Sequence, residues 1–362
     1  MPNAFELRQQ LADKLKRDGA LRDAAVERAV RAVPRHLFSP DTPLESAYED
    51  RVLRLKDEGG VVLSTISQPA MIVEMLQQLR IAPGHRVLEI GTGSGYTTAL
   101  LATLTGPTGC VVSIDLESDL VEAAQQRFEE FGLLHVHASA ADGALGEAAY
   151  APYDRVLLTV CAADIVAAWW EQLARGGRIV LPLSLRGVQK SIAFAELHGV
   201  LESESIVDCG FLMLRGPSLP DERVERDRIR AIARAEVPVR RLAAEISERD
   251  LYAGLMLWIA LQDDHFCRID KSEEQYPAVG LCIGDSLALL VLHPVRGIAS
   301  FGSELGLGRR LSDLVAAWDA AGRPGKRGMH VTAVRSRAET KVPEGASFAV
   351  RRPETTFYVS LR

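Results

Sequence analysis

Cysteine is scarce in this sequence, and the few cysteines stand far apart. They are Cys110, Cys161, Cys209, Cys267 and Cys282, with no Cys-x-x-Cys pair and no nearby histidine at metal-ligand spacing. Zinc centres and disulfide frameworks depend on such groupings. We therefore expect reduced cysteines in the core or in strands, with no metal site.

Long apolar runs and an excess of positive charge are missing as well. No stretch approaches the roughly 18 to 20 apolar residues that a membrane-spanning helix needs, and the first residues are not typical of a signal peptide. Lys and Arg number 42 against 48 Asp and Glu, a net charge of -6. No global basic field attracts nucleic acid or anionic membrane. We expect a cytoplasmic protein that binds neither.

The remaining composition is that of an ordinary globular protein of two domains. The chain has 362 residues, of which 47% are hydrophobic and 25% charged. A cluster of proline and glycine at 215–220 precedes a charged run at 221–230, which indicates a boundary near 217. We expect a first domain at 1–216 and a second at 217–362.

Hydrophobic periodicity predicts an α/β fold for the first domain. Helical spacing covers 4–17 and 21–32, and a further helix is expected at 68–79. Apolar strands then alternate with helices. The expected strands are 86–90, 110–114, 135–138, 155–160 and 178–183, and the expected helices are 95–104, 117–131 and 164–174, the last closed by Gly176-Gly177. Such alternation is typical of a doubly wound parallel sheet.

The pattern changes after this alternation. Runs at 191–197 and 206–214 have no helix between them and suit an antiparallel hairpin at the sheet edge. The second domain is expected to be a smaller α+β unit. Its pattern is helical at 224–262 and 310–321, with strands at 279–283, 287–292, 297–301, 329–334 and 357–361. This domain is a candidate for peptide recognition.

The most informative segment is a strand that runs into a glycine-rich turn. Gly91, Gly93 and Gly95 let the backbone approach a ligand closely, and the helix that follows offers free N–H groups. A dinucleotide-binding turn would need a third glycine at position 96, which is Tyr96. The spacing favours S-adenosylmethionine over NAD.

Two acids stand at the ends of the next strands. Asp115 closes the strand after the glycine turn, where a carboxylate can accept from both ribose hydroxyls. Asp142, followed by Gly143, could accept from the adenine amino group. Either acid alone is more typical of a helix cap or a loop. Together at successive strand ends, they favour an adenosine site.

Longer motifs surround these residues. They are Val33-Pro34-Arg35-His36-Leu37-Phe38, Ala47-Tyr48-Glu49-Asp50, Thr65-Ile66-Ser67-Gln68-Pro69, Leu88 to Tyr96, Asp142-Gly143 and Ala151-Pro152-Tyr153-Asp154. Over residues 20–216 the sequence resembles the protein-L-isoaspartate O-methyltransferases. The glycine motif alone would mark any class I methyltransferase, whereas Thr-Ile-Ser-Gln-Pro at this distance before it is more particular.

The resemblance implies a class I S-adenosylmethionine-dependent methyltransferase fold, a Rossmann-like doubly wound sheet. It implies S-adenosylmethionine as donor, S-adenosylhomocysteine as product and a peptide or protein carboxylate as acceptor. It places Ser67 in the active site with Thr65, on a segment that touches cofactor and substrate. The cofactor-binding residues expected are Ser64, Thr65, Ile66, Ser67, Glu89, Gly91, Thr92, Gly93, Gly95, Asp115, Leu116, Asp142 and Gly143. The oligomeric state stays open.

This chemistry needs few polar residues. A carboxylate has a pKa near about 4 and is ionised at neutral pH, so no general base is required. Catalysis then reduces to placement and exclusion of water. Ser67 would orient the carboxylate, and it could equally cap the helix that begins at Gln68-Pro69.

Two departures separate the sequence from the repair enzymes of this family. Residues 51–64 are longer and more charged than the family's usual Pro-Leu-Pro-Ile-Gly-x-Gly-Gln stretch, and the chain continues beyond 217. Extended relatives resemble tailoring enzymes that esterify an Asp of a ribosomally made peptide, after which an aspartimide can close. We hypothesise a dedicated peptide substrate, with isoaspartyl repair as the alternative.

Other functions fit less well. A nucleic-acid methyltransferase of adenine amines would carry an Asn-Pro-Pro-Tyr type motif where this chain reads Leu158-Thr159-Val160-Cys161. A small-molecule methyltransferase shares the fold, and a dehydrogenase conflicts with the glycine spacing. A binding module with a degenerate cofactor site also remains, because a fold alone does not guarantee activity.

Overall fold

The computed structural model describes residues 2–216, 229, 233, 237–242, 244–269, 278–293, 296–304, 306–337 and 342–361. The chain forms two compact units. The N-terminal unit comprises Met1–Leu183 and Lys190–Leu219, and the C-terminal unit comprises Ser184–Gln189 and Pro220–Arg362. Most of the charged run at 221–230 lies outside the described residues.

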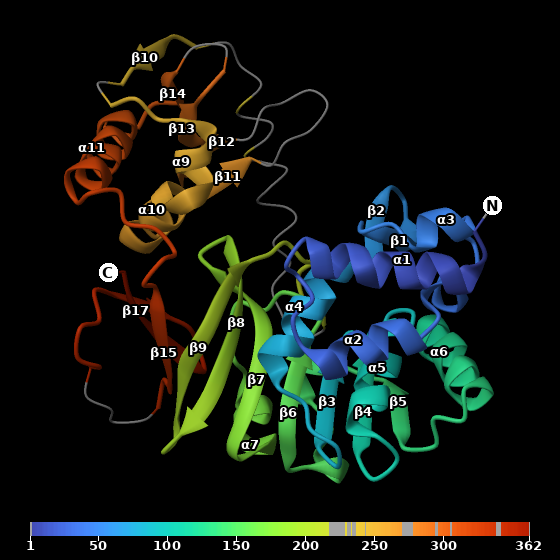
Figure 1. The fold of residues 1–362 in the computed structure, drawn as a ribbon. Helices are drawn as coiled ribbons and strands as arrows, with labels where there is room; N and C mark the ends of the chain where they lie inside the picture. Colours follow the sequence, from blue (N-terminus) through green and yellow to red (C-terminus); the bar gives the residue numbers. More distant parts are fainter. Residues whose placement is uncertain are drawn as a thin grey trace. The chain divides into compact units, whose positions relative to one another are not determined.

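The N-terminal unit is built on a sheet of the expected doubly wound kind (Figure 1). Its strand order is β9-β8-β7-β6-β3-β4-β5. The strands are β3 (Arg86–Ile90), β4 (Cys110–Asp115), β5 (Val136–Ala140), β6 (Tyr153–Leu158), β7 (Leu173–Leu185), β8 (Val188–Leu197) and β9 (Val200–Asp208). β3 pairs in parallel with β4 and β6, whereas β8 and β9 pair antiparallel. The expected hairpin is confirmed, but its second strand ends at 208 rather than 214.

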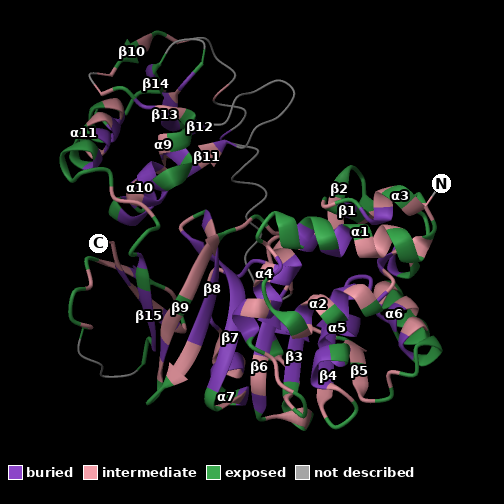
Figure 2. Cartoon of the chain, in the orientation of Figure 1, coloured by how far each residue is buried: buried purple, intermediate pink, exposed green. Residues whose placement is uncertain are grey.

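Helices enclose the parallel strands. They are α1 (Ala4–Arg17), α2 (Ala24–Ala32), α4 (Pro69–Leu79), α5 (Tyr96–Thr105), α6 (Ser118–Glu130) and α7 (Ala167–Gln172). One core cluster joins Leu15, Val30 and Leu76 from the helices to Val87 and Val111 of the sheet, all nearly inaccessible to water. Figure 2 shows the central strands as largely buried, as the apolar runs in the sequence require.

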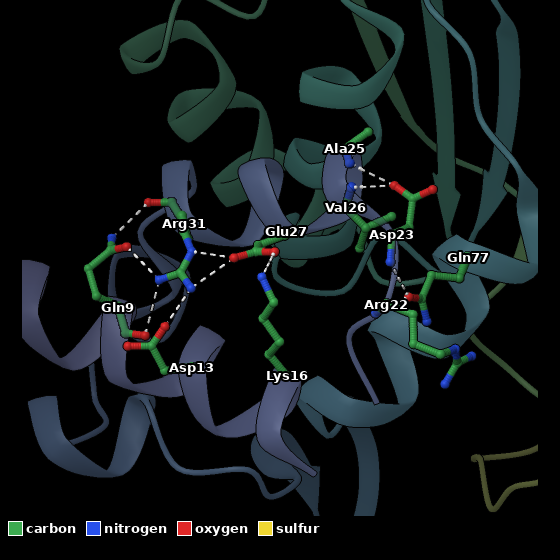
Figure 3. Close-up of polar contacts among 10 residues, drawn as sticks. All are labelled: Gln9, Asp13, Lys16, Arg22, Asp23, Ala25, Val26, Glu27, Arg31 and Gln77. Atoms are coloured by element: carbon green, nitrogen blue, oxygen red, sulfur yellow. Dashed lines mark hydrogen bonds and ion pairs between the residues drawn. The ribbon is translucent and has the colours of Figure 1, made fainter. Parts of the chain in front are cut away.

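Polar contacts fix the N-terminal helices to one another (Figure 3). Arg31 of α2 donates to Asp13 of α1 at 2.5 Å and to Glu27 at 2.9 Å. Asp23 caps α2 by accepting from the backbone of Ala25 and Val26. Gln77 of α4 accepts from the Asp23 backbone N–H at 2.9 Å, so this pair of helices is also attached to α4.

The charged stretch at 51–64 forms a hairpin. β1 (Leu53–Glu58) and β2 (Val61–Ile66) pair antiparallel as a separate two-stranded sheet, with irregular register near Lys56. The short helices η1 (Arg35–Phe38) and α3 (Leu44–Ala47) precede it. β2 continues directly into Ser67 and then α4, so the hairpin positions the Thr-Ile-Ser segment.

The helix expected at 164–174 is shorter than the periodicity predicted. α7 ends at Gln172, and Gly176-Gly177 lies inside β7 instead of capping a helix. Tyr153 pairs with Leu173 and Arg155 with Arg178, so β7 carries extra residues at this point. The two glycines accommodate this irregularity because Gly176 adopts a positive φ of 69°.

The C-terminal unit contains antiparallel strands and helices. Its five-stranded sheet has the order β10 (Val239–Arg241), β14 (Gly297–Phe301), β13 (Ser286–Val291), β12 (Ala278–Ile283) and β11 (Phe266–Ile269). β10 lies inside the segment predicted as helical at 224–262, so that prediction is wrong there. The described helical part is α9 (Glu248–Asp250), η4 (Leu251–Leu255) and α10 (Met256–Gln262). The remaining elements are α11 (Leu307–Ala320), β15 (His330–Arg335), β16 (Phe348–Arg351) and β17 (Thr355–Ser360).

Candidate active site

The glycine turn after β3 is shaped by positive φ angles and tight packing. Gly91, Gly93 and Gly95 have φ of 105°, 50° and 86°. A Cβ at Gly91 would lie 2.4 Å from Oγ1 of Thr159, and one at Gly95 would lie 2.8 Å from the Phe128 ring. Only glycine satisfies both the backbone conformation and the available space. The turn therefore leaves its backbone open to close approach by a ligand.

Asp115 connects the glycine turn to the next strand. It is the last residue of β4, and its Oδ2 accepts from the Gly93 N–H at 2.7 Å. Its Oδ1 accepts from the Glu117 N–H at 3.1 Å. The carboxylate is thus held at the carboxyl end of the sheet, where ligands bind in open α/β folds.

A cleft opens at this end of the strands. It has about 640 Å³ of empty volume, a figure that includes open solvent. Its lining includes seven residues expected from the sequence. They are Ser64, Thr65, Gly91, Gly93, Asp115, Leu116 and Gly143. Leu116 is 40% exposed, an apolar surface available to a flat ring.

The other expected site residues are not in the cleft lining. Ile66 is 5% exposed and packs in the core, and Gly95 faces Phe128. Asp142 caps η2 (Gly143–Leu145) by accepting from the Ala144 N–H at 2.9 Å. Thr92 is buried and shares a 2.7 Å hydrogen bond with Ser113.

Glu89, another expected cofactor residue, also lies outside the cleft lining. Its side chain is fully buried, and its Oε2 accepts from Thr98 at 2.5 Å and Ser113 at 2.7 Å. Oε1 has no hydrogen-bond partner within the described part of the chain. Burial raises the pKa of Glu89 to about 7, the two hydroxyl donors oppose the rise, and the Asp115 charge adds to it. The Glu89 side chain therefore ties β3 to α5 and β4, and it is not among the residues that line the cleft.

Ser67 follows β2 and is half-buried. It does not cap α4, because the N-cap residue is Gln68. Asp50 takes that role by accepting from the Ala70 N–H at 2.9 Å and from the Gln68 side chain at 3.1 Å. Ser67 itself is not among the residues that line the cleft, and no hydrogen bond of its Oγ is found among the residues that the structure describes.

The sequence reasoning missed one wall of the cleft. Residues 212–215 line it, and this segment pairs with the backbone of Cys161. The Cys161 N–H donates to Leu212 O at 2.8 Å, and the Cys161 carbonyl accepts from the Leu214 N–H at 2.7 Å. Arg215 then donates to Leu63 O at 3.2 Å and to Glu117 at 2.8 Å. No local pattern marks these residues, because their contacts are to segments distant in sequence.

The Arg215 contact belongs to an ion network at the cleft. Lys56 of the β1–β2 hairpin donates to Glu117 at 2.6 Å and to Asp119 at 2.8 Å. Lys56 and Arg215 together hold the pKa of Glu117 below its ordinary value. The hairpin is therefore attached to the start of α6, two residues beyond Asp115.

The arrangement offers groups that could hold a sulfonium nucleoside. The glycine turn, Asp115 and apolar Leu116 supply backbone donors, a hydroxyl acceptor and a ring contact. Within the described ranges, no three His, Cys, Asp or Glu side chains gather at metal-binding distance. Nor does any described helix have the length and apolar character needed to cross a membrane.

Comparison with known proteins identifies related sequences. Residues 6–217 match the family model described as Protein-L-isoaspartate(D-aspartate) O-methyltransferase. A Hyperthermus butylicus protein-L-isoaspartate O-methyltransferase is 35% identical over 58% of this chain and 89% of its own length. An enzyme of the same name from Azorhizobium caulinodans is 39% identical over 55% and 88%.

Two solved structures share the fold. One, described as a protein-L-isoaspartate O-methyltransferase, is 22% identical and covers 98% of this chain and 99% of its own, with a TM-score of 0.59. A second, a Plasmodium falciparum structure described as an enzyme of this kind in complex with S-adenosyl-L-homocysteine, is 20% identical and covers 59% and 99%, with a TM-score of 0.51. The class I methyltransferase fold is confirmed, and the C-terminal extension has a structural counterpart.

Proposed function

This chain belongs to the protein-L-isoaspartate O-methyltransferase family and is an S-adenosylmethionine-dependent carboxyl methyltransferase; on that premise we propose that it esterifies an aspartyl or isoaspartyl carboxylate of a peptide. The observation that carries the proposal is the cleft in which the Thr-Ile-Ser segment meets the glycine turn. Ser64 and Thr65 line this cleft together with Gly93 and Asp115.

We assign the cofactor to the glycine turn and the strand ends beside it. Asp115 would accept from the ribose hydroxyls, with Leu116 against the nucleoside and Gly91 and Gly93 at the amino-acid part. Gly143 lines the same cleft, and Asp142 beside it is the candidate acceptor for the adenine amino group. When bound, S-adenosylmethionine supplies a methyl group activated by a sulfonium.

The residues of the chain then act by placement. The acceptor carboxylate is ionised at neutral pH and needs no base. Ser67 and Thr65 donate hydrogen bonds that orient one carboxylate oxygen, and the apolar wall of Leu212 and Leu214 excludes water. Correct placement of two reactants supplies on the order of 7 to 11 kcal/mol of the barrier.

We propose further that the acceptor is a dedicated peptide and that the ester leads to an aspartimide. In that step the backbone nitrogen of the following residue forms a bond to the ester carbonyl carbon and loses its proton. Methanol leaves with that proton, and a five-membered imide remains. The charged β1–β2 hairpin beside the cleft supports a dedicated substrate, because Arg54, Asp57 and Glu58 are exposed on it.

Isoaspartyl repair is the second candidate. The full-length match to a structure described as a protein-L-isoaspartate O-methyltransferase favours it, because the C-terminal unit is then not peculiar to tailoring enzymes. The two candidates share the same cleft and the same methyl transfer. They differ in whether sequence around the acceptor residue matters.

The test compares three acceptors with purified full-length protein and S-adenosylmethionine. They are a short isoaspartyl peptide of arbitrary sequence, its L-aspartyl counterpart, and a precursor peptide encoded beside the gene. Mass spectrometry follows the methyl ester and the later loss of methanol. Turnover of the precursor alone, with imide formation, supports tailoring, whereas comparable turnover of arbitrary isoaspartyl peptides supports repair. Methylation of none of them refutes the proposed function.

A further inference from the structure

The side chain of Arg35, on the short helix η1 ahead of the β1–β2 hairpin, is fully buried. Its guanidinium touches three of the motifs that the sequence singled out. Nε donates to Ala47 O at 3.1 Å, Nη2 donates to Ser67 O at 3.0 Å, and the group lies over the Tyr96 ring at 4.9 Å. One side chain therefore contacts α3, the Thr-Ile-Ser segment and the start of α5.

These contacts are specific to a guanidinium. Two donors at fixed angles reach two carbonyl oxygens while the planar face stacks on an aromatic ring. A lysine ammonium at the same place could serve one carbonyl but could not bridge both and stack. The geometry links Ser67 to Tyr96, which follows the glycine turn directly.

Burying this charge is costly. Burial lowers the pKa of Arg35 although the nearby Tyr96 and Asp50 oppose that shift, and Nη1 has no hydrogen-bond partner within the described ranges. The carboxylate of Asp50 caps α4, where it accepts from Ala70 N and from the Gln68 side chain. A packed apolar residue would fill the space without leaving an unsatisfied donor. Core stability alone therefore does not explain why this buried position carries a charge.

We propose that Arg35 is a positioning residue for methyl transfer: it fixes the Ser67 peptide relative to the glycine turn and so holds the acceptor-binding segment against the cofactor site. The inference rests on the proposed role of Ser67 in the active site. Displacement of a reacting group by about 1 Å can cost roughly 100-fold in rate, so an anchor on this peptide affects turnover first.

The chain offers a matched control at the other end of α4. Arg178 is 7% exposed, donates to Gln78 O at 3.3 Å and pairs with Glu204 at 2.6 Å. Arg35 donates to the Ser67 carbonyl just before α4, whereas Arg178 donates to the Gln78 carbonyl in the last turn of α4. Replacing either arginine removes a buried guanidinium, but only Arg35 contacts the Thr-Ile-Ser segment.

The experiment compares Arg35→Lys, Arg35→Gln and Arg178→Lys with the wild type. We measure kcat and KM for the methyl-accepting peptide, S-adenosylhomocysteine affinity by calorimetry, and thermal unfolding. For the Arg35 variants we expect kcat to fall about 10- to 100-fold, with KM and S-adenosylhomocysteine affinity within about threefold. Arg178→Lys should keep kcat within about threefold even where it lowers the unfolding temperature.

Each outcome decides the question. Arg35→Lys with wild-type kcat overturns the proposal, as does an equal loss of kcat in Arg178→Lys. If neither Arg35 variant folds and binds S-adenosylhomocysteine while Arg178→Lys does, Arg35 is structural and the proposal also fails. A wild type that methylates no peptide refutes the proposed function instead, so the two failures are distinct.

Discussion

Replacing Glu89 with glutamine should make the N-terminal unit more stable, increasingly so as the pH rises. The pKa of Glu89 is raised from 4.5 to about 7 because the carboxylate is buried. At about 1.4 kcal/mol for each pH unit between these values, ionising Glu89 costs the folded state about 3 kcal/mol. Glutamine keeps an oxygen that accepts from Thr98 and Ser113 and never ionises.

The direction in which stability changes with pH follows from proton binding to Glu89. Between pH 4.5 and about 7, the unfolded chain has lost the Glu89 proton while the folded chain keeps it. Folding therefore binds a proton in this window, and stability falls as pH rises through it. Below this window the acid is protonated in both states. Above it both states are ionised and the full loss of about 3 kcal/mol is present.

The assay is thermal or denaturant unfolding of wild type and Glu89→Gln from about pH 5 to about pH 8. The relevant transition is the one that S-adenosylhomocysteine shifts, because the chain has two units and need not unfold in one step. For a domain of this size, about 3 kcal/mol corresponds to roughly 6 to 12 °C. Glu129→Gln, which changes an exposed carboxylate on α6, is the control. A difference between Glu89→Gln and wild type that stays constant with pH would refute the reasoning.

Three further substitutions test the site. Asp115→Asn should weaken S-adenosylhomocysteine binding about 10- to 100-fold by calorimetry, because bonds to a charged acceptor are worth about 1.5 to 3 kcal/mol. Asp154→Asn is the control, because the Asp154 carboxylate accepts from the Arg86 N–H at the opposite end of the strands. This substitution should leave S-adenosylhomocysteine affinity unchanged, and an equal loss of affinity in both variants would contradict the assignment of Asp115. Ser67→Ala should lower kcat by up to about 100-fold with unchanged S-adenosylhomocysteine binding, and unchanged kcat would exclude Ser67 from the reaction. Gly95→Ala should destabilise the protein by about 2 kcal/mol or more in denaturant unfolding, because φ is positive and Phe128 lies 2.8 Å from the new Cβ; wild-type stability would contradict the packing argument.

Much of the proposed cofactor site could be predicted because its residues are close in sequence. The glycine turn and Asp115 each follow a strand, and parallel strands bring their carboxyl ends to one edge. The family resemblance also implied Leu116 and Gly143, which do line the cleft. It could not separate Glu89 from these, because a residue's place in a motif does not reveal which face of the strand its side chain occupies.

The Gly176-Gly177 pair shows a second limit of local reasoning. A glycine pair after an apolar helical stretch is typical of a helix end, yet here it lies in β7. The choice between a cap and a strand irregularity depends on the pairing of β6 with β7. Pairing partners are distant in sequence, so periodicity cannot supply them.

The sequence by itself determined the alternation of strands and helices, the glycine turn and the acids at the strand ends, since these follow from short-range periodicity and backbone conformation. Tertiary structure alone decided that Glu89 is buried against Thr98 and Ser113, that residues 212–215 line the cleft, and that Arg35 joins Ser67 to Tyr96. The physical reason is that burial and hydrogen bonding between distant segments depend on how the whole chain packs.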